Sequence, residues 1–154
     1  MAISIGDILT PERTLFDAPV SSKKKLLEHL AGFVADLIPD SSADDIYERL
    51  LGRERLGSTG IGEGIAIPHC RLPQCQKPFG VLLRLSEAID YDAVDRRPVD
   101  LVFALFVPEQ ANDEHLQVLA MLARNFTEPD YREALRNAPD AGRLYQRALN
   151  TEAL

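Results

Sequence analysis

The sequence predicts an α/β fold, a three-layer sandwich in which a mixed and mostly buried β-sheet is flanked by helices. Residues 99–107 are nearly all apolar, which is typical of a strand covered on both faces. Helical patterns, with apolar residues at 3.6-residue spacing, lie on both sides of it in the chain. The length of 154 residues, 45% of them hydrophobic, is typical of one domain with a substantial core. We therefore expect a single domain over residues 1–154.

Two helices are predicted in the first half of the chain. The first spans 21–38, where Ser21 or Ser22 can cap the start and Pro39 ends it. The second spans 43–55, with Ser42 as its N-cap. The residues expected to be buried are Leu26, Leu27, Leu30, Phe33, Val34 and Leu37 in the first helix, and Ile46, Tyr47, Leu50 and Leu51 in the second. Lys23, Lys24 and Lys25 are expected to form a solvated basic patch.

The second half of the chain is predicted to contribute strands and then helices. Branched residues predict a strand over 79–85, and a central strand follows over 99–107. Asn112 is expected to cap a third helix, whose apolar stripe consists of Leu116, Leu119, Ala120, Ala123 and Phe126. Two shorter helices are expected near 131–137 and 140–149.

Charge and composition exclude several classes of protein. The chain has 17 Lys and Arg against 24 Asp and Glu, a net charge of −7. This balance argues against a nucleic-acid binder, which needs a basic face, and against docking on anionic lipid. The apolar runs are too short for a membrane-spanning helix, and the first residues lack a signal-peptide pattern. With only two cysteines, the sequence indicates a cytoplasmic protein.

A glycine-rich segment precedes the most informative histidine. The segment Gly57, Ser58, Thr59, Gly60, Ile61, Gly62, Glu63, Gly64 could direct backbone N–H groups at an anion, or could simply form a turn. Its spacing matches neither a P-loop nor a dinucleotide-binding fingerprint. His69 follows the rigid residue Pro68, and we expect it to act as a base, a metal ligand or a nucleophile.

Three further side chains need an assignment. Arg53 lies two turns after Ile46, and its spacing fits a side chain that covers the helix end as well as one that binds an anion. His115 is expected in the first turn of the third helix, where the positive end of the dipole favours anions. A solvent-facing or capping role explains His115 equally well. His29 is assigned to packing.

No metal or cofactor is expected. His69, Cys70, Cys75 and His115 could be drawn as zinc ligands, but C-x4-C without a second pair is a weak zinc signal. A buried Cys70 and an incidental surface Cys75 are expected instead. An arginine, backbone amides and two histidines suit a phosphoryl group, which needs positioning and charge neutralisation. Because the sequence contains no ATP-binding motif, the expected phosphoryl donor is another protein.

One segment of the sequence carries a family resemblance, Arg53-Glu-Arg-Leu-Gly-Ser-Thr-Gly-Ile-Gly-Glu-Gly-Ile-Ala-Ile-Pro-His69. Here the sequence resembles the IIA domains of the bacterial phosphotransferase system, fructose/mannitol class. Within that class it resembles most the stand-alone nitrogen-regulatory IIA proteins. The resemblance runs from about Ile5 to Leu149, and the segment Pro98–Pro108 and the pair His115-Leu116 continue it in order. It implies the fold of the type-2 EIIA domains.

The resemblance also implies roles for three residues. His69 would be phosphorylated on Nε2 by a phosphohistidine of an HPr-like carrier, His115 would hydrogen-bond the phosphoryl group, and Arg53 matches an arginine near the site. In nitrogen-regulatory relatives the phosphorylation state controls binding to other proteins, including potassium-transport and sensor-kinase partners. Cys70 stands where the family commonly has glycine, so phosphorylation is expected to be sensitive to oxidation.

Three alternatives remain open at this point. The first is a sugar-specific IIA component that passes its phosphoryl group to a IIB domain. The second is a metal-dependent hydrolase or zinc module that uses His69, Cys70, Cys75 and His115. The third is an interaction domain in which Gly57–Gly64 is only a turn.

Overall fold

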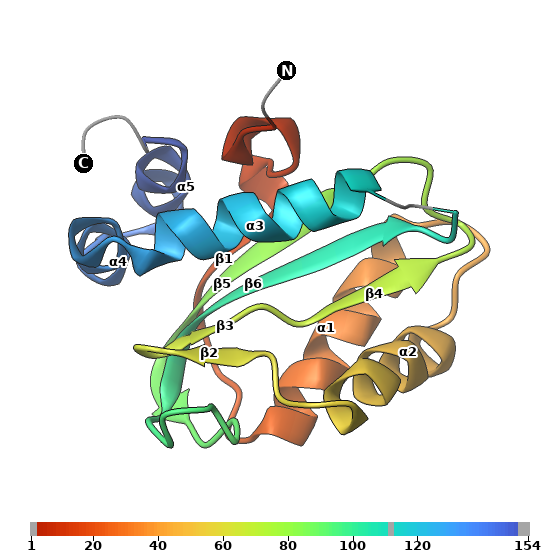
Figure 1. Ribbon diagram of the computed structural model, residues 1–154, viewed down its shortest axis with the longest axis horizontal. Helices are drawn as coiled ribbons and strands as arrows, with labels where there is room; N and C mark the ends of the chain where they lie inside the picture. The colour runs from red at the N-terminus through yellow and green to blue at the C-terminus, as the bar shows by residue number, and fades with distance from the viewer. Residues whose placement is uncertain (1–2, 111–112, 151–154) are drawn as a thin grey trace.

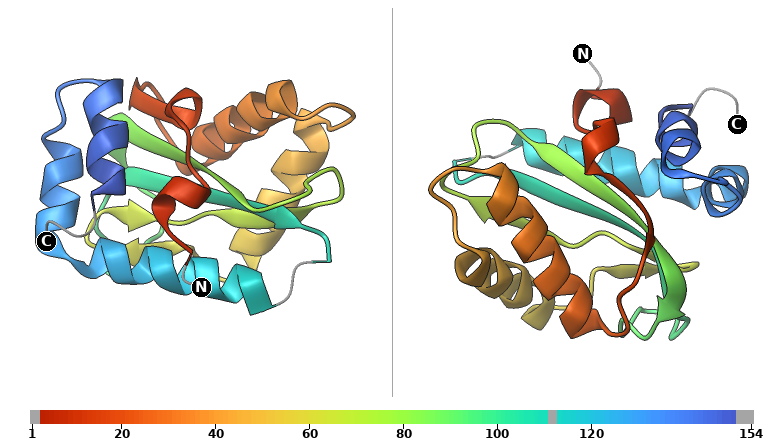
Figure 2. Two further views of the ribbon diagram at one scale, coloured as in Figure 1. Left: turned by 90° about the horizontal axis from the view of Figure 1, so that it is seen from above. Right: turned by 180° about the vertical axis from the view of Figure 1, so that it is seen from behind.

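A computed structural model describes residues 3–110 and 113–150. Within this part of the chain, a mixed sheet of six strands lies between two layers of helices (Figure 1). One face is covered by α1 (Lys23–Leu37) and α2 (Ala43–Arg55). The other face is covered by α3 (Asp113–Thr127), α4 (Pro129–Arg136) and α5 (Ala141–Leu149), as both views of Figure 2 show. The predicted three-layer α/β fold is confirmed.

The central strand of the sheet is β6 (Val99–Pro108). On one side it pairs antiparallel with β5 (Phe79–Ile89). On its other side two short strands, β3 (Ile65–Ala66) and β4 (His69–Leu72), pair in parallel with successive parts of β6. The sheet is completed by β1 (Thr14–Ala18), parallel to β5, and β2 (Gly60–Gly62), antiparallel to β3.

Alternate residues of β6 contribute to two separate cores. Val102, Ala104 and Phe106 pack with α1 and α2, whereas Leu101 and Phe103 pack with the helices of the opposite layer. Successive side chains of a strand point to opposite faces, so a strand with helices on both sides must be apolar throughout. The prediction of a central strand here is confirmed.

Local capping residues fix the helix starts. Ser22 Oγ accepts a hydrogen bond from the amide of Lys25 at 3.1 Å, and Ser42 Oγ accepts one from the amide of Asp45 at 3.0 Å. Asp140 caps α5 in the same way. The predicted cap Asn112 lies outside the described residues.

The apolar stripe predicted for α3 is confirmed at Phe126, with Leu119 packed at the edge of the core, but was wrong at Leu116, Ala120 and Ala123. The side chains that face the sheet are those of Val118, Met121, Leu122 and Phe126, whereas Leu116 is 59% exposed and Ala120 and Ala123 are also exposed. The helix carries apolar residues on two faces, and periodicity alone does not say which face meets the sheet. Leu116 therefore lies open to solvent immediately after His115.

Further expectations about burial were also wrong. Leu37 is 44% exposed, whereas Phe33 in α1 and Tyr47 and Leu51 in α2 are half-buried and pack against the core as predicted. His29 is exposed and does not pack, whereas Cys75 is only 7% exposed rather than on the surface. Nothing in the sequence indicated β1 or the two 3-10 helices η1 (Ile5–Asp7) and η2 (Pro11–Arg13). No helix among the described residues is long and apolar enough to cross a membrane.

Candidate functional site

His69 is the first residue of β4 and is fixed by the segment just before it. Its Nδ1 lies 2.9 Å from the carbonyl oxygen of Ile67. A carbonyl oxygen can only accept, so Nδ1 carries the proton and donates it to Ile67. The ring is therefore the tautomer whose Nε2 holds a free electron pair.

Arg53 lies in the last turn of α2 and is directed at that electron pair. Its Nε donates to His69 Nε2 at 3.2 Å, and its Nη1 donates to the carbonyl oxygen of Gly57 at 2.9 Å. The second bond ties the guanidinium to the turn that follows α2. The bond to Gly57 fits a side chain that covers the helix end, and the bond to His69 places the same guanidinium where an anion at Nε2 would meet it.

His115 approaches the same point from the first turn of α3. The ring centroids of His69 and His115 are 6.4 Å apart, with 44° between the ring planes. His115 Nδ1 is buried and has no hydrogen-bond partner among the described residues. The site thus brings together side chains from α2, β4 and α3, and one buried ring nitrogen of His115 has no hydrogen-bond partner among the described residues.

The surroundings of His69 keep its ring neutral. Burial lowers the pKa of His69 below 6.5, and the positive charge of Arg53 and the neighbouring ring of His115 lower it further. The hydrogen bond to Ile67 and the carboxylate of Glu54 act in the opposite direction. At neutral pH the ring is therefore uncharged, which is the form that can act as a nucleophile.

A buried carboxylate beside Arg53 was missed in the sequence. Glu54 is 8% exposed, and its carboxylate accepts hydrogen bonds from the amide and the hydroxyl of Thr59. Lys23 completes the group by forming an ion pair with Glu54 at 2.9 Å. The expectation that Lys23 belongs to a solvated basic patch was therefore wrong. An acidic residue in the last turn of a helix interacts unfavourably with the helix dipole. This unusual position of Glu54 was the one sign in the sequence that its carboxylate needs partners from elsewhere in the fold.

This Glu54 network is connected to the ring of His69 through backbone. The Thr59 hydroxyl also lies 3.0 Å from the hydroxyl of Tyr91, whose pKa is raised by burial and by Glu54. The Thr59 carbonyl oxygen accepts a hydrogen bond from the amide of Ile67 at 3.0 Å. Because Ile67 in turn accepts the Nδ1 proton of His69, the network helps to fix the orientation of the ring.

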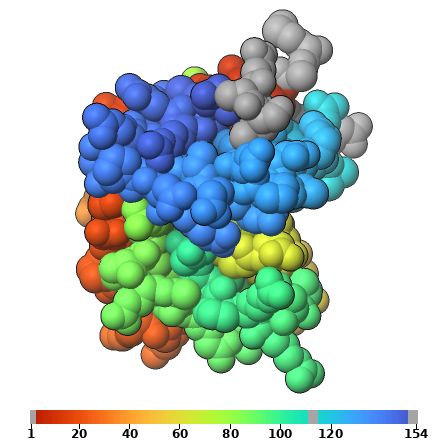
Figure 3. Space-filling view, turned by 90° about the vertical axis from the view of Figure 1, so that its left-hand side faces the viewer, coloured from red at the N-terminus to blue at the C-terminus, as the bar shows by residue number. Residues whose placement is uncertain are grey.

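The glycine-rich segment forms a hairpin. Glu63 and Gly64, both with positive φ (58° and 80°), make the two-residue turn between β2 and β3. Arg136 of α4 donates to the Glu63 carbonyl oxygen and forms an ion pair with Asp100. These contacts hold the hairpin against the C-terminal helices, which lie next to it in Figure 3. The amide of Glu63 is already bonded to Asp95. Much of the hairpin's backbone is thus occupied by structural bonds.

The two cysteines face the core rather than the site. His69 and Cys70 are successive residues of one strand and so point to opposite faces of the sheet. Cys70 packs in the core beneath α1 and α2, and burial raises the pKa of its thiol to about 12. Among the residues that the structure describes, no three His, Cys, Asp or Glu side chains are grouped to hold a metal ion. The geometry gives no support to a zinc module.

Comparison with known proteins gives a consistent set of relatives. The family model for the phosphoenolpyruvate-dependent sugar phosphotransferase system, EIIA 2, matches residues 7–150. A nitrogen regulatory protein of Pseudomonas aeruginosa is 50% identical over 144 residues, which cover 94% of each chain. The crystal structure of nitrogen regulatory protein IIA-Ntr from Neisseria meningitidis has a TM-score of 0.87 at 39% identity, and the match covers 94% of this chain and 98% of that one. A fructose-specific EIIA component of Haloferax volcanii is 35% identical over 134 residues, 87% of each chain.

Proposed function

The chain belongs to the phosphotransferase-system EIIA 2 family, and from that premise we propose that His69 accepts a phosphoryl group from a phosphohistidine of an HPr-like carrier. The observation that carries the proposal is the pair of bonds on His69. Nδ1–H donates to the Ile67 carbonyl oxygen, and Nε2 keeps its lone pair. Among the described residues, only Arg53 donates a hydrogen bond to that lone pair.

The proposed reaction is an in-line displacement at phosphorus. The electron pair of His69 Nε2 forms the new N–P bond while the N–P bond of the donor breaks and its electron pair returns to the donor ring. The Nδ1 proton stays on His69, hydrogen-bonded to Ile67, so the ring needs no external base. A neutral ring at pH 7 supports this step.

We assign charge stabilisation to Arg53. In the resting site its Nε occupies the Nε2 lone pair, so it must leave that nitrogen when the phosphorus arrives. Its other anchor, the carbonyl of Gly57, keeps the guanidinium close enough to bind the equatorial oxygens. The amides of the hairpin are given a smaller role because several of them are already bonded.

We assign to His115 a hydrogen bond to the phosphoryl group. It lies in the first turn of α3, where the dipole favours negative charge, and its ring is 6.4 Å from that of His69. Leu116 beside it and Leu56 after Arg53 are 59% and 84% exposed. These two exposed apolar side chains lie close in the sequence to Arg53 and His115, and they suit a protein donor that docks over His69.

The regulatory part of the proposal rests on the relatives. The 50% identical protein of P. aeruginosa is named a nitrogen regulatory protein, as is the 39% identical protein of N. meningitidis. We infer that the phosphorylation state of His69 controls binding to partner proteins. The partners expected are of the classes that the resemblance implies, potassium-transport and sensor-kinase components.

Labelling of the full chain by a phosphorylated HPr-type carrier tests the acceptor. One acid-labile phosphoryl group per chain is expected by mass spectrometry, and none in His69→Ala. His115→Ala should accept the group but hold or transfer it poorly. His29→Ala, which removes an exposed histidine of α1, is the matched control and should be labelled as the wild type is. Label on His69→Ala would overturn the assignment.

A second candidate function is a sugar-specific EIIA component, which the 35% identity to a fructose-specific relative favours. It is distinguished by incubating the phosphorylated chain with a purified fructose-type IIB domain. The regulatory proposal expects the phosphoryl group to remain on His69. Rapid, stoichiometric transfer to the IIB domain would establish the sugar-specific function in its place.

A further inference from the structure

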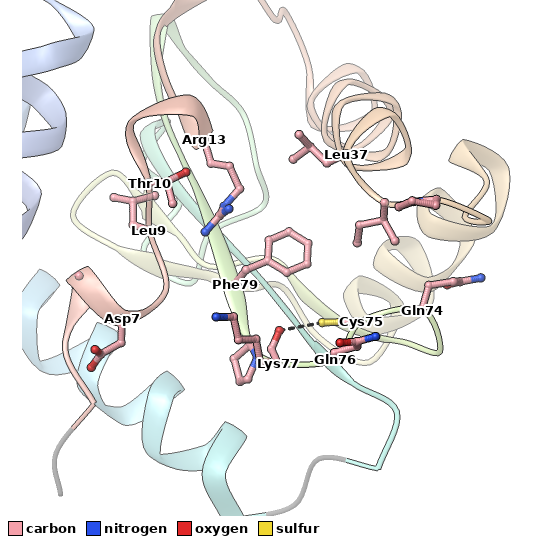
Figure 4. Close-up of a pocket in the computed structure, with 14 residues that line it drawn as sticks. Asp7, Leu9, Thr10, Arg13, Leu37, Gln74, Cys75, Gln76, Lys77 and Phe79 are labelled. Carbon is pink, nitrogen blue, oxygen red and sulfur yellow. Dashed lines mark hydrogen bonds between the residues drawn. The ribbon is translucent and has the colours of Figure 1, made fainter.

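A large cavity lies away from the phosphorylation site, where the start of the chain, the end of α1 and residues 74–79 meet (Figure 4). Its volume is about 960 Å³, at the upper end of the range of small-molecule sites. Arg53, His69 and His115 do not line it. The proposed reaction therefore does not account for it.

A fixed cation forms part of its wall. Arg13 Nε donates to the Gly80 carbonyl oxygen at 2.9 Å, and Nη2 donates to that of Ile8 at 3.0 Å. The guanidinium carbon also lies 5.3 Å from the centre of the Phe79 ring, and the two side chains lie together in Figure 4. These three contacts hold the guanidinium in one place and leave Nη1 and part of Nη2 for another partner.

Arg13 forms no close ion pair. None of the ion pairs within 4 Å that the described residues form includes it. Burial lowers the pKa of this guanidinium, and this effect outweighs the opposing influence of Glu12 and Tyr145. A partly buried cation without a directly bonded anion is unfavourable, so the cavity presents a preformed position for a negative group. Lys77 also lines the cavity and adds a second positive charge.

The opposite wall is apolar. Leu37, Ile38 and Pro39 at the end of α1 line the cavity there, and Phe79 adds apolar surface beside Arg13. Leu37 belongs to the stripe expected to be buried, yet it is 44% exposed. A simple inorganic anion would leave this surface in contact with water, whereas a ligand with an apolar body would cover it.

We propose that this cavity binds a small organic carboxylate, with its carboxylate on Arg13 and Lys77 and its apolar body against Leu37, Ile38 and Phe79. One acidic residue, Asp7, lines the same cavity, and its carboxylate already accepts from the amide of Ser4. Two cationic side chains against one acidic side chain suit a singly charged carboxylate better than a doubly charged phosphate group.

Benzoate is a suitable probe, with benzamide as its uncharged analogue and inorganic phosphate as an anion without an apolar body. In an NMR titration of the full chain, benzoate is expected to shift the backbone amide signals of residues 74–80 saturably. Benzamide and phosphate are expected to produce no saturable shift over the same concentrations. No saturable shift with benzoate overturns the proposal, and equal binding of phosphate or benzamide overturns the ligand class.

Two variants test the two walls separately. Arg13→Lys keeps a charge but loses the planar donors, and should weaken benzoate binding at least about tenfold. Leu37→Ser alters only the apolar wall, is tolerated because the side chain is already exposed, and should weaken binding about fivefold. Val94→Ser is the matched control, since Val94 is 74% exposed and does not line the cavity. Benzoate affinity unchanged in Leu37→Ser would contradict the proposed pose.

Discussion

The two ring nitrogens of His69 have different partners, and this difference leaves one reactive position on the ring. A carbonyl oxygen holds the proton of Nδ1, while a guanidinium faces Nε2. The phosphorylation proposed at Nε2 requires no change at Nδ1. Among the described residues, it is Arg53 that has to leave Nε2, and this side chain already has a second anchor at Gly57.

The surroundings of His69 predict its titration. The pKa of the ring in the folded protein should lie below 6.5, chiefly because the ring is buried. As the pH falls, His69 is protonated in the unfolded chain before it is protonated in the folded protein. The contribution of the neutral ring to the stability of the folded protein is therefore complete above the unfolded pKa of about 6.5. It is lost as the pH falls through the lower pKa of the folded protein.

NMR titration of the imidazole signals measures this midpoint directly. Arg53→Gln removes a neighbouring positive charge and should raise the midpoint, whereas Glu54→Gln removes a negative charge and should lower it further. Shifts in the same direction in both variants would contradict this electrostatic interpretation.

The buried ion pair of Lys23 and Glu54 predicts a large effect on stability. The side chain of Glu54 is only 3% exposed, so Lys23→Met would leave a buried carboxylate without its cation. The free energy of unfolding should fall by about 3 kcal/mol in urea denaturation. Arg143→Ala, which breaks an exposed ion pair with Asp140, should change it by less than about 0.5 kcal/mol. Equal effects of the two substitutions would rule out a special role for the buried pair.

At the scale of the elements, the helices were predictable and the short strands were not. The caps Ser22 and Ser42 and the stop at Pro39 are local signals, so the ends of α1 and α2 were found to within about two residues. Strands β2, β3 and β4 contain only two to four residues each, too few to show a periodic pattern. β3 and β4 pair with residues of β6 that lie more than thirty positions further along the chain, and β2 joins the sheet only through β3.

The hairpin of β2 and β3 predicts a strong effect at Gly64. Its φ of 80° is strained for any other residue, and an added Cβ would collide with Arg136 and lie 2.9 Å from Asp100. Gly64→Ala should lower the free energy of unfolding by roughly 1–3 kcal/mol. Gly52→Ala, where a Cβ meets open space inside α2, should instead raise it by roughly 0.5–1 kcal/mol. Thermal denaturation distinguishes the two signs.

On the scale of the whole molecule, the site depends on three segments that are distant in the sequence. The residue types and the family resemblance indicated His69, His115 and Arg53, but no spacing rule predicts that Arg53 Nε meets His69 Nε2. The Glu54 network was missed for the same reason, since its partners Lys23 and Tyr91 lie on other elements. Such contacts follow from the packing of layers, which local patterns do not contain.

The burial of Cys70 in the core argues against the redox sensitivity expected from the sequence. Cys70 and Cys75 are each 7% exposed, and burial raises the pKa of both thiols. Peroxide should leave phosphorylation unchanged, and a thiol-reactive dye should label the native protein far more slowly than the protein in urea. His29→Cys provides an exposed thiol for comparison. Native labelling as fast as that of His29→Cys would contradict this expectation.

The pairing of β1 has a consequence for the order of folding. The loop between β5 and β6 consists only of residues 90–98. A much longer stretch of chain separates Thr14 of β1 from its partner Leu82 in β5. Closing the longer loop costs more conformational entropy, so we expect the β5–β6 hairpin to form first and β1 to dock after the rate-limiting step. Leu15→Ala should then accelerate unfolding in stopped-flow experiments while hardly changing the refolding rate. The edge of the sheet that lies farthest from His69 would be the last to form and the first to open.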